Sequence, residues 1–141
     1  MLQFSLIAVT AAACAAVLVV RRYLAVVRVH GGSMSPALED GERVLVRRRP
    51  ARVRAGDIVV FPVPGQIRVE RRQLIKRVAA VPGDAIPACV LGAVRGLPGE
   101  HVPTGKLVVL GDAQASTDSR AWGYLHRADV NGTVIRKIPS R

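Results

Sequence analysis

The first twenty residues of the chain carry no charged side chain, and this segment most constrains what the chain can fold into. An apolar run of this length matches the ~20 residues that an α-helix needs to cross a bilayer. We therefore expect one N-terminal transmembrane helix, extended by Arg21-Arg22 and the apolar Tyr23 to Val27 into an anchor over residues 1–27. A cleaved signal peptide fits less well, because no basic segment precedes the apolar run and the run exceeds the usual 7–15 residues. The string Ala11-Ala12-Ala13-Cys14 leaves a lipoprotein-type cleavage site as a further alternative.

The remaining residues, 28–141, are enough for one small domain and too few for two. Cys89 is the only cysteine in this part, so a disulfide within it is excluded. Short β-rich runs alternate with turn residues and no long amphipathic helix is evident, which predicts a mainly β fold, a small antiparallel sheet or barrel-like domain. The predicted strands are Arg43 to Arg47, Asp57 to Phe61, Gln73 to Val81, Lys106 to Leu110 and Thr133 to Ile138.

The formal net charge of +11 indicates an anionic partner, either lipid headgroups or nucleic acid. Only 4% of the residues are aromatic, so there is little to stack bases on, and we predict no specific nucleic-acid partner. A cluster of six arginines fits a phospholipid surface better; a solvated, arginine-biased face is the alternative. The cluster consists of Arg43, Arg47, Arg48, Arg49, Arg52 and Arg54.

Ser33, in the string Ser33-Met34-Ser35-Pro36, is a candidate nucleophile that lacks an obvious histidine base. A serine hydroxyl attacks poorly unless a neighbouring group takes its proton. None of His30, His101 and His126 sits in a recognisable catalytic string, although His30 leaves a triad open. A lysine can replace histidine if its pKa falls from about 10.4 toward 7, which requires burial.

Lys76 lies where a buried lysine is expected. In a strand over Gln73 to Val81, the period of two places Lys76 on one face with Leu74, Val78 and Ala80. The adjacent cation Arg77 is expected to lower the pKa of Lys76 further. The chain has 18 arginines and only 3 lysines, and arginine cannot deprotonate in a protein, so a lysine here has a chemical reason; chance survival under a compositional bias is the alternative.

Several separated strings, in this order, resemble one family, the type I signal peptidases, which are membrane-anchored Ser/Lys proteases that remove signal peptides from exported proteins. Ser33 to Leu38 is similar to the nucleophile segment, with Ala37 where threonine is common. Leu74 to Val78, running on to Asp84, is similar to the lysine segment, and Gly56 to Phe61 to a supporting strand between the two. Gly111-Asp112 with Ser116 to Arg120 is similar to a third segment.

The resemblance implies a role for each matching residue. Ser33 attacks the substrate carbonyl, Lys76 accepts and later returns the proton, and Ser116 orients the lysine amine. The Ser33 backbone N–H stabilises the oxyanion, while Gly31 stands where some relatives supply a second donor. The residues that would shape the site are Met34, Pro36, Asp118 and Arg120. For Met34 plain core packing is the alternative, and no metal or cofactor is implied.

The resemblance also implies preprotein substrates with small residues at the first and third positions before the cut, and a single-pass protein of the cell membrane with its catalytic domain outside the cytoplasm. Arg21, Arg22 and Arg28 oppose that orientation by the positive-inside rule. The interval from Asp84 to Gly111 is too short for the large second β domain of some relatives. A dedicated maturation peptidase, like those that trim nickel superoxide dismutase, is therefore an alternative. A non-enzymatic, membrane-tethered basic domain is another, and a self-cleaving repressor-type protease fits less well.

Overall fold

A computed structural model describes residues 2–64 and 73–139 of the chain, and the strands of this part form one antiparallel sheet. The sheet has seven strands in the order β1-β2-β7-β3-β4-β5-β6. Their bounds are Leu24–Arg28 (β1), Arg43–Arg48 (β2), Ile58–Pro62 (β3), Gln73–Ala80 (β4), Lys106–Leu110 (β5), Leu125–His126 (β6) and Gly132–Ile138 (β7). The mainly β, antiparallel prediction is confirmed, but the sheet is open, with β1 and β6 at its two edges, and does not close into a barrel.

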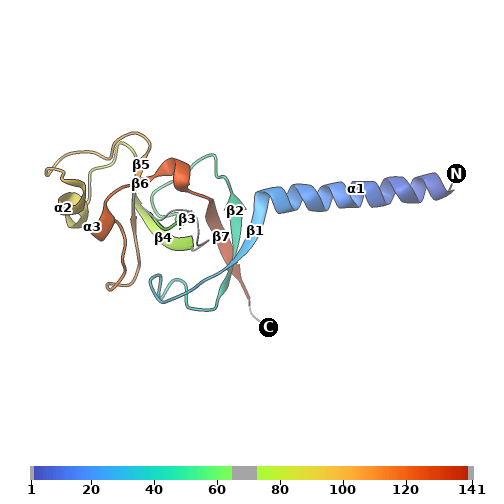
Figure 1. Ribbon diagram of the computed structural model, residues 1–141, viewed down its shortest axis with the longest axis horizontal. Coiled ribbons are helices and arrows are strands. Elements are labelled where there is room, and N and C mark those ends of the chain that lie inside the picture. Colours follow the sequence, from blue (N-terminus) through green and yellow to red (C-terminus); the bar gives the residue numbers. More distant parts are fainter. Residues whose placement is uncertain (1, 65–72, 140–141) are drawn as a thin grey trace.

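Helix α1 (Leu2–Tyr23) projects away from the sheet and leads directly into β1 (Figure 1). Its described apolar side chains are exposed, Leu18 to 67% and Val20 to 54%. Across the described residues, no helix combines the length and the apolarity that crossing a bilayer requires, so the predicted transmembrane helix is not supported. Residues 24–27, predicted as the end of the anchor, lie instead in β1, where Leu24 to Arg28 pair with β2.

The chain order of the strands explains how distant segments meet. The last strand, β7, lies between β2 and β3, so residues more than seventy positions apart in sequence pair with it on either side. Gly132 in β7 is required there, because a side chain would collide with Val46 and with the Arg47 carbonyl of β2. Each of the five predicted strands is present, with ends shifted by at most one residue.

Apolar side chains fill both faces of the central strands. Strand β4 shows this directly: Ile75 packs with Met34 and Val60 on one face, while Val78 packs with Phe61 on the other. A third, smaller apolar cluster around Val90 and Val108 lies near the other end of the sheet. Lys76 therefore sits in a strand that is covered on both sides.

The segment between β4 and β5 contains only two short helices, η1 (Ala88–Val90) and α2 (Leu91–Val94), and the isolated bridge Ala85–His101. It holds no second β domain. Two further short elements, α3 (Ser119–Trp122) and η2 (Arg127–Asp129), flank β6. Together α2, α3, β5 and β6 lie at the end of the molecule away from α1 (Figure 1).

Candidate active site

Lys76 lies in the middle of β4 and is only 2% exposed. It pairs across the sheet with Val59 of β3, and Val78 of the same strand is also buried, as the period-two pattern predicted. Burial lowers the pKa of the Lys76 amine; the Asp118 carboxylate opposes this shift and the Arg120 guanidinium adds to it. The amine is thus held in an environment that favours its neutral form.

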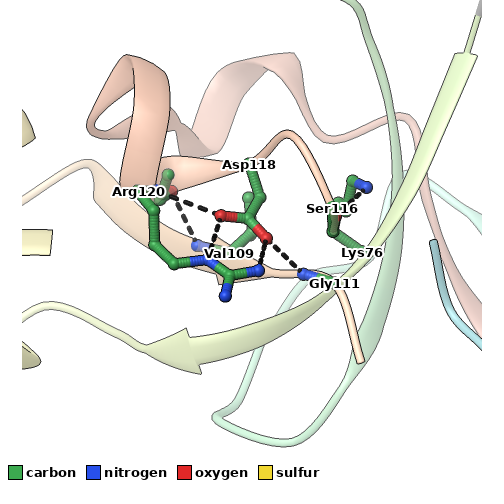
Figure 2. A network of polar contacts seen from close by, with 7 residues as sticks. Lys76, Val109, Gly111, Ser116, Asp118 and Arg120 are labelled. Carbon is green, nitrogen blue, oxygen red and sulfur yellow. Dashed lines mark hydrogen bonds and ion pairs between the residues drawn. The ribbon is translucent and has the colours of Figure 1, made fainter. Parts of the chain in front are cut away.

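Ser116 contacts that amine. The Lys76 Nζ donates a hydrogen bond of 2.6 Å to the Ser116 Oγ, although the two residues are forty positions apart (Figure 2). Ser116 belongs to the loop between β5 and α3, whose Ser116 N–H donates to the Ala113 carbonyl. The loop thereby fixes the hydroxyl, and the hydroxyl fixes the direction of the lysine amine.

Asp118 organises the end of the same loop, and its side chain is fully buried. Its carboxylate accepts from the Gly111 N–H (2.8 Å), from the Arg120 N–H (3.1 Å) and from the Arg120 guanidinium at 2.9 and 2.7 Å (Figure 2). Burial alone would raise the pKa of this carboxyl, but the guanidinium and the two N–H groups outweigh burial and lower the pKa to about 2. Asp118 also caps α3, so one carboxylate ties β5, the loop and α3 together.

Ser33 lies in the turn that follows β1 and is partly exposed. Asp40 fixes the start of this turn, because its Oδ1 accepts from the N–H of Gly31, which has a φ of +79° that favours glycine. Met34, 1% exposed, anchors the turn in the apolar core, and the exposed Pro36 follows a cis Ser35–Pro36 bond. The turn therefore rests on a buried methionine while the neighbouring serine hydroxyl stays accessible.

Gly111 shows how closely the turn of Ser33 approaches the loop of Ser116. A Cβ added at Gly111 would lie 2.6 Å from the Ser33 carbonyl oxygen and would also collide with the Ser116 side chain. The Ala113 N–H donates to the same Ser33 carbonyl at 3.1 Å. Only a residue without a side chain fits there, and the turn of Ser33, the Ser116 loop and Lys76 form one cluster as a result.

A hollow of about 1140 Å³ opens beside this cluster. One wall is β1 with the turn after it, including Val29, Ser33 and Met34. The opposite wall is the first half of β4, Gln73 to Ile75, which immediately precedes Lys76. Further lining residues are Val63, Pro64, Thr117 and Trp122. The site thus combines a partly exposed serine, a buried amine and a mostly apolar cleft.

Two contacts were missed or misassigned from the sequence. Arg77 donates two hydrogen bonds, of 2.9 and 2.7 Å, to the Asp112 carboxylate. It does not contribute to the lowered pKa of Lys76, so that prediction was wrong. Arg120 is the cation that does so. Ser119 is fully buried and its Oγ accepts a hydrogen bond from the Val109 N–H at 3.0 Å. This contact between α3 and β5 was not predicted from the sequence.

The histidines do not assemble a triad. His30 lines the cleft with Ser33, but no carboxylate in the described part of the chain hydrogen-bonds its ring. His101 bridges to Ala85, and His126 contacts Lys106. Within residues 2–64 and 73–139, no three His, Cys, Asp or Glu side chains gather in a way that could hold a metal ion.

Comparison with known proteins identifies the family of the chain. A model of the family "Signal peptidase, peptidase S26" matches residues 2–94 and 89–138. The chain belongs to this family. It is 29% identical to Signal peptidase I of Leptolyngbya laminosa, over 82% of this chain and 70% of that protein. It is 28% identical to Signal peptidase IB of Staphylococcus aureus strain COL, over 75% of this chain and 73% of that protein.

As a member of the S26 signal peptidases, the chain is a serine peptidase and a hydrolase. The resemblance predicted from the ordered motifs is therefore confirmed, and the enzyme is favoured over a non-enzymatic basic domain. The roles of individual residues within the site are not decided by family membership. They rest on the geometry described above.

Proposed function

We propose that Ser33 and Lys76 form a Ser/Lys dyad that cleaves signal peptides from exported preproteins. The observation that supports this most is the buried Lys76 amine, whose pKa is lowered by burial and which Ser116 holds next to the turn of Ser33. A lowered pKa increases the neutral fraction of the amine, and only the neutral amine can accept a proton.

The reaction follows from these positions. Neutral Lys76 takes the hydroxyl proton as the Ser33 Oγ attacks the scissile carbonyl, which gives a tetrahedral oxyanion and a lysine ammonium. The ammonium then protonates the departing amine and the C–N bond breaks, leaving an acyl ester on Ser33. A water molecule, deprotonated by the same lysine, hydrolyses the ester and restores the serine. Ser116 keeps the amine directed throughout.

The oxyanion requires donors that are in place before charge develops. In the described part of the chain, the Ser33 N–H donates to no backbone or side-chain acceptor. It is therefore available for an oxyanion. Gly31 supplies no hydroxyl, and its N–H is committed to Asp40, so it contributes no second donor.

The cleft fits an extended peptide. Strand β1 pairs only with β2, and the first half of β4, Gln73 to Ile75, pairs only with β3 among the described strands. Both walls of the hollow thus present unpaired backbone to a chain lying between them. The lining includes Met34 and Ile75, apolar side chains suited to small apolar substrate residues.

We also place the enzyme at a membrane, as a single-pass protein with the catalytic domain outside the cytoplasm. The support for attachment is α1, which projects away from the sheet (Figure 1). Its exposed Val9, Val17 and Val19 would otherwise face water. Outward orientation follows from the location of exported preproteins. Flotation of the full-length protein with phosphatidylcholine vesicles, before and after a carbonate wash, tests the attachment.

Substitution tests the dyad. In detergent, Ser33→Ala and Lys76→Arg should each lower kcat/KM on a preprotein with an Ala-x-Ala site by at least about a thousandfold, because one lacks the nucleophile and the other carries a permanent cation. Lys106→Arg, at an exposed pair with His126, is the matched control and should cleave normally. Activity retained in Lys76→Arg would exclude lysine as the base. A panel of several preproteins distinguishes a general from a dedicated peptidase.

A further inference from the structure

A second hollow, of about 500 Å³, lies where α1 meets the sheet, away from the active-site cleft. Its lining combines four arginines with two apolar side chains of α1. They are Leu18, Val19, Arg21, Arg22, Arg48 and Arg49. We call these six residues the arginine pocket. The two pairs of arginines come from segments that are more than twenty-five positions apart, so the fold and not a basic run brings them together.

Within residues 2–64 and 73–139, the side chains of the four arginines form no ion pair. The ion pairs in the described part of the chain involve Arg77, Arg120 and Lys137 instead. Arg21 and Arg22 occupy the last turn of α1, where cations favour the helix C-terminus. That explanation does not extend to Arg48 and Arg49, which end β2 and begin the following loop. Four exposed guanidinium groups therefore surround one hollow, and none of them forms an ion pair with a described carboxylate.

Arg49 adds a second, independent observation. Its backbone has a φ of +48°, a conformation that is costly for a residue with a side chain and usual for glycine. Its N–H donates to the Asn131 carbonyl at 3.0 Å, which holds it in that conformation. A glycine would adopt this backbone without strain, yet the chain has an arginine there, and its side chain lines the pocket.

We propose that the arginine pocket binds the phosphate of an anionic phospholipid, with the acyl chains lying along α1. Guanidinium groups bind phosphate oxygens in a bidentate manner, and Leu18 and Val19 on the same hollow match the hydrocarbon that a lipid carries next to its phosphate. Free phosphate or a nucleic-acid backbone offers no apolar part for these two side chains. The proposal rests on the membrane attachment proposed above, and it adds a specific lipid class and a specific site.

The experiment uses the full chain with Ser33→Ala, so that it is independent of cleavage, in phosphatidylcholine vesicles. Spin-labelled phosphatidylglycerol and spin-labelled phosphatidylcholine are the probes, and the immobilised fraction of each gives their relative association with the protein. We expect phosphatidylglycerol to be preferred severalfold. Arg48→Gln with Arg49→Gln should reduce this preference to near parity, a fall of roughly fivefold.

The matched control is Arg52→Gln with Arg54→Gln, which removes the same charge from exposed arginines outside the pocket. The control should keep the preference. Equal loss in both double variants would show diffuse charge attraction and overturn the pocket, as would a parent protein without any preference. Loss of the preference when inorganic phosphate is added at constant ionic strength would assign the site to free phosphate instead. Near-ultraviolet circular dichroism of each variant verifies the fold. Failure of cleavage by the Ser33 enzyme would refute the proposed dyad and leave this result unaffected.

Discussion

A lysine can take a proton from serine only while it is itself uncharged, so the proposed dyad depends on the protonation state of Lys76. The structure lowers its pKa chiefly by burial in a doubly covered strand. The Asp118 carboxylate raises the pKa of Lys76. Arg120, which is paired with that carboxylate, lowers the pKa of Lys76 and so offsets part of the effect of Asp118. The net direction is the one that a base requires.

This direction predicts the pH dependence of cleavage. The neutral fraction of Lys76 rises with pH and is half at its lowered pKa, so kcat/KM should fall as pH drops through a value below the ordinary 10.5. The profile is measured on a preprotein in detergent between about pH 5 and pH 10. His30→Gln is the control, because His30 is the one histidine in the cleft. If His30→Gln abolished cleavage at every pH, the result would indicate a histidine base.

Residue by residue, the sequence predicted the face of Lys76 but not its electrostatic partners. Alternation along β4 decides burial, and alternation is visible in the sequence. The same alternation sends Arg77 to the opposite face, where Asp112 takes it. The cation that lowers the pKa of Lys76 is Arg120, which the loop after β5 places near the amine. That loop has no period from which its path could be predicted.

At the scale of elements, the connection from β5 to α3 depends on Asp118. Asp118→Asn removes the charge that Arg120 and two N–H groups stabilise, and we expect the free energy of unfolding at pH 7 to fall by about 2 kcal/mol or more. Asp112→Asn, at a more exposed ion pair, should cost less than about 1 kcal/mol. Urea unfolding followed by tryptophan fluorescence compares the two.

The pH dependence of this difference has a fixed sign. The pKa of Asp118 is about 2 when folded and has an ordinary value of 3.8, so its contribution is complete above about pH 4 and is lost as pH falls through 2. The gap in stability between the parent protein and Asp118→Asn should therefore narrow on acidification. A gap that stays constant from neutral pH to about pH 2 would show that the carboxylate charge contributes nothing.

The strands with clear apolar runs were predictable as elements, and the short ones were not. Strands β2, β3, β4, β5 and β7 follow alternating or continuous apolar residues bounded by turn residues. Strand β1 was assigned to the anchor because Leu24 to Val27 continue an apolar composition. Strand β6 and helix α3 contain two and four residues, too few for any period to show. The position of β7 between β2 and β3 depends on tertiary contacts, so no local sequence pattern predicts it.

At the scale of the whole molecule, the site exists because the sheet order joins three separate segments. The turn after β1 brings Ser33, the middle of β4 brings Lys76, and the loop after β5 brings Ser116. Gly111 lets the first and third segments approach within contact distance. We therefore propose that strand β1 belongs to the catalytic domain, because it leads into the turn of Ser33 and lines the cleft.

Two truncations separate this role of β1 from that of α1. A variant that begins at Tyr23 keeps the five paired positions of β1 with β2 and should unfold cooperatively and cleave a preprotein in detergent like the full chain. A variant that begins at Val29 loses those pairs, the packing of Val27 against the apolar core and one wall of the cleft. Its free energy of unfolding should fall by about 3 kcal/mol or more, as when a large buried side chain is truncated. Its kcat/KM should fall by at least about tenfold. Urea unfolding and cleavage assays on both proteins test whether the catalytic domain requires β1. If the shorter protein matched the longer one in stability and rate, β1 would be part of the anchor and the catalytic domain would begin after it.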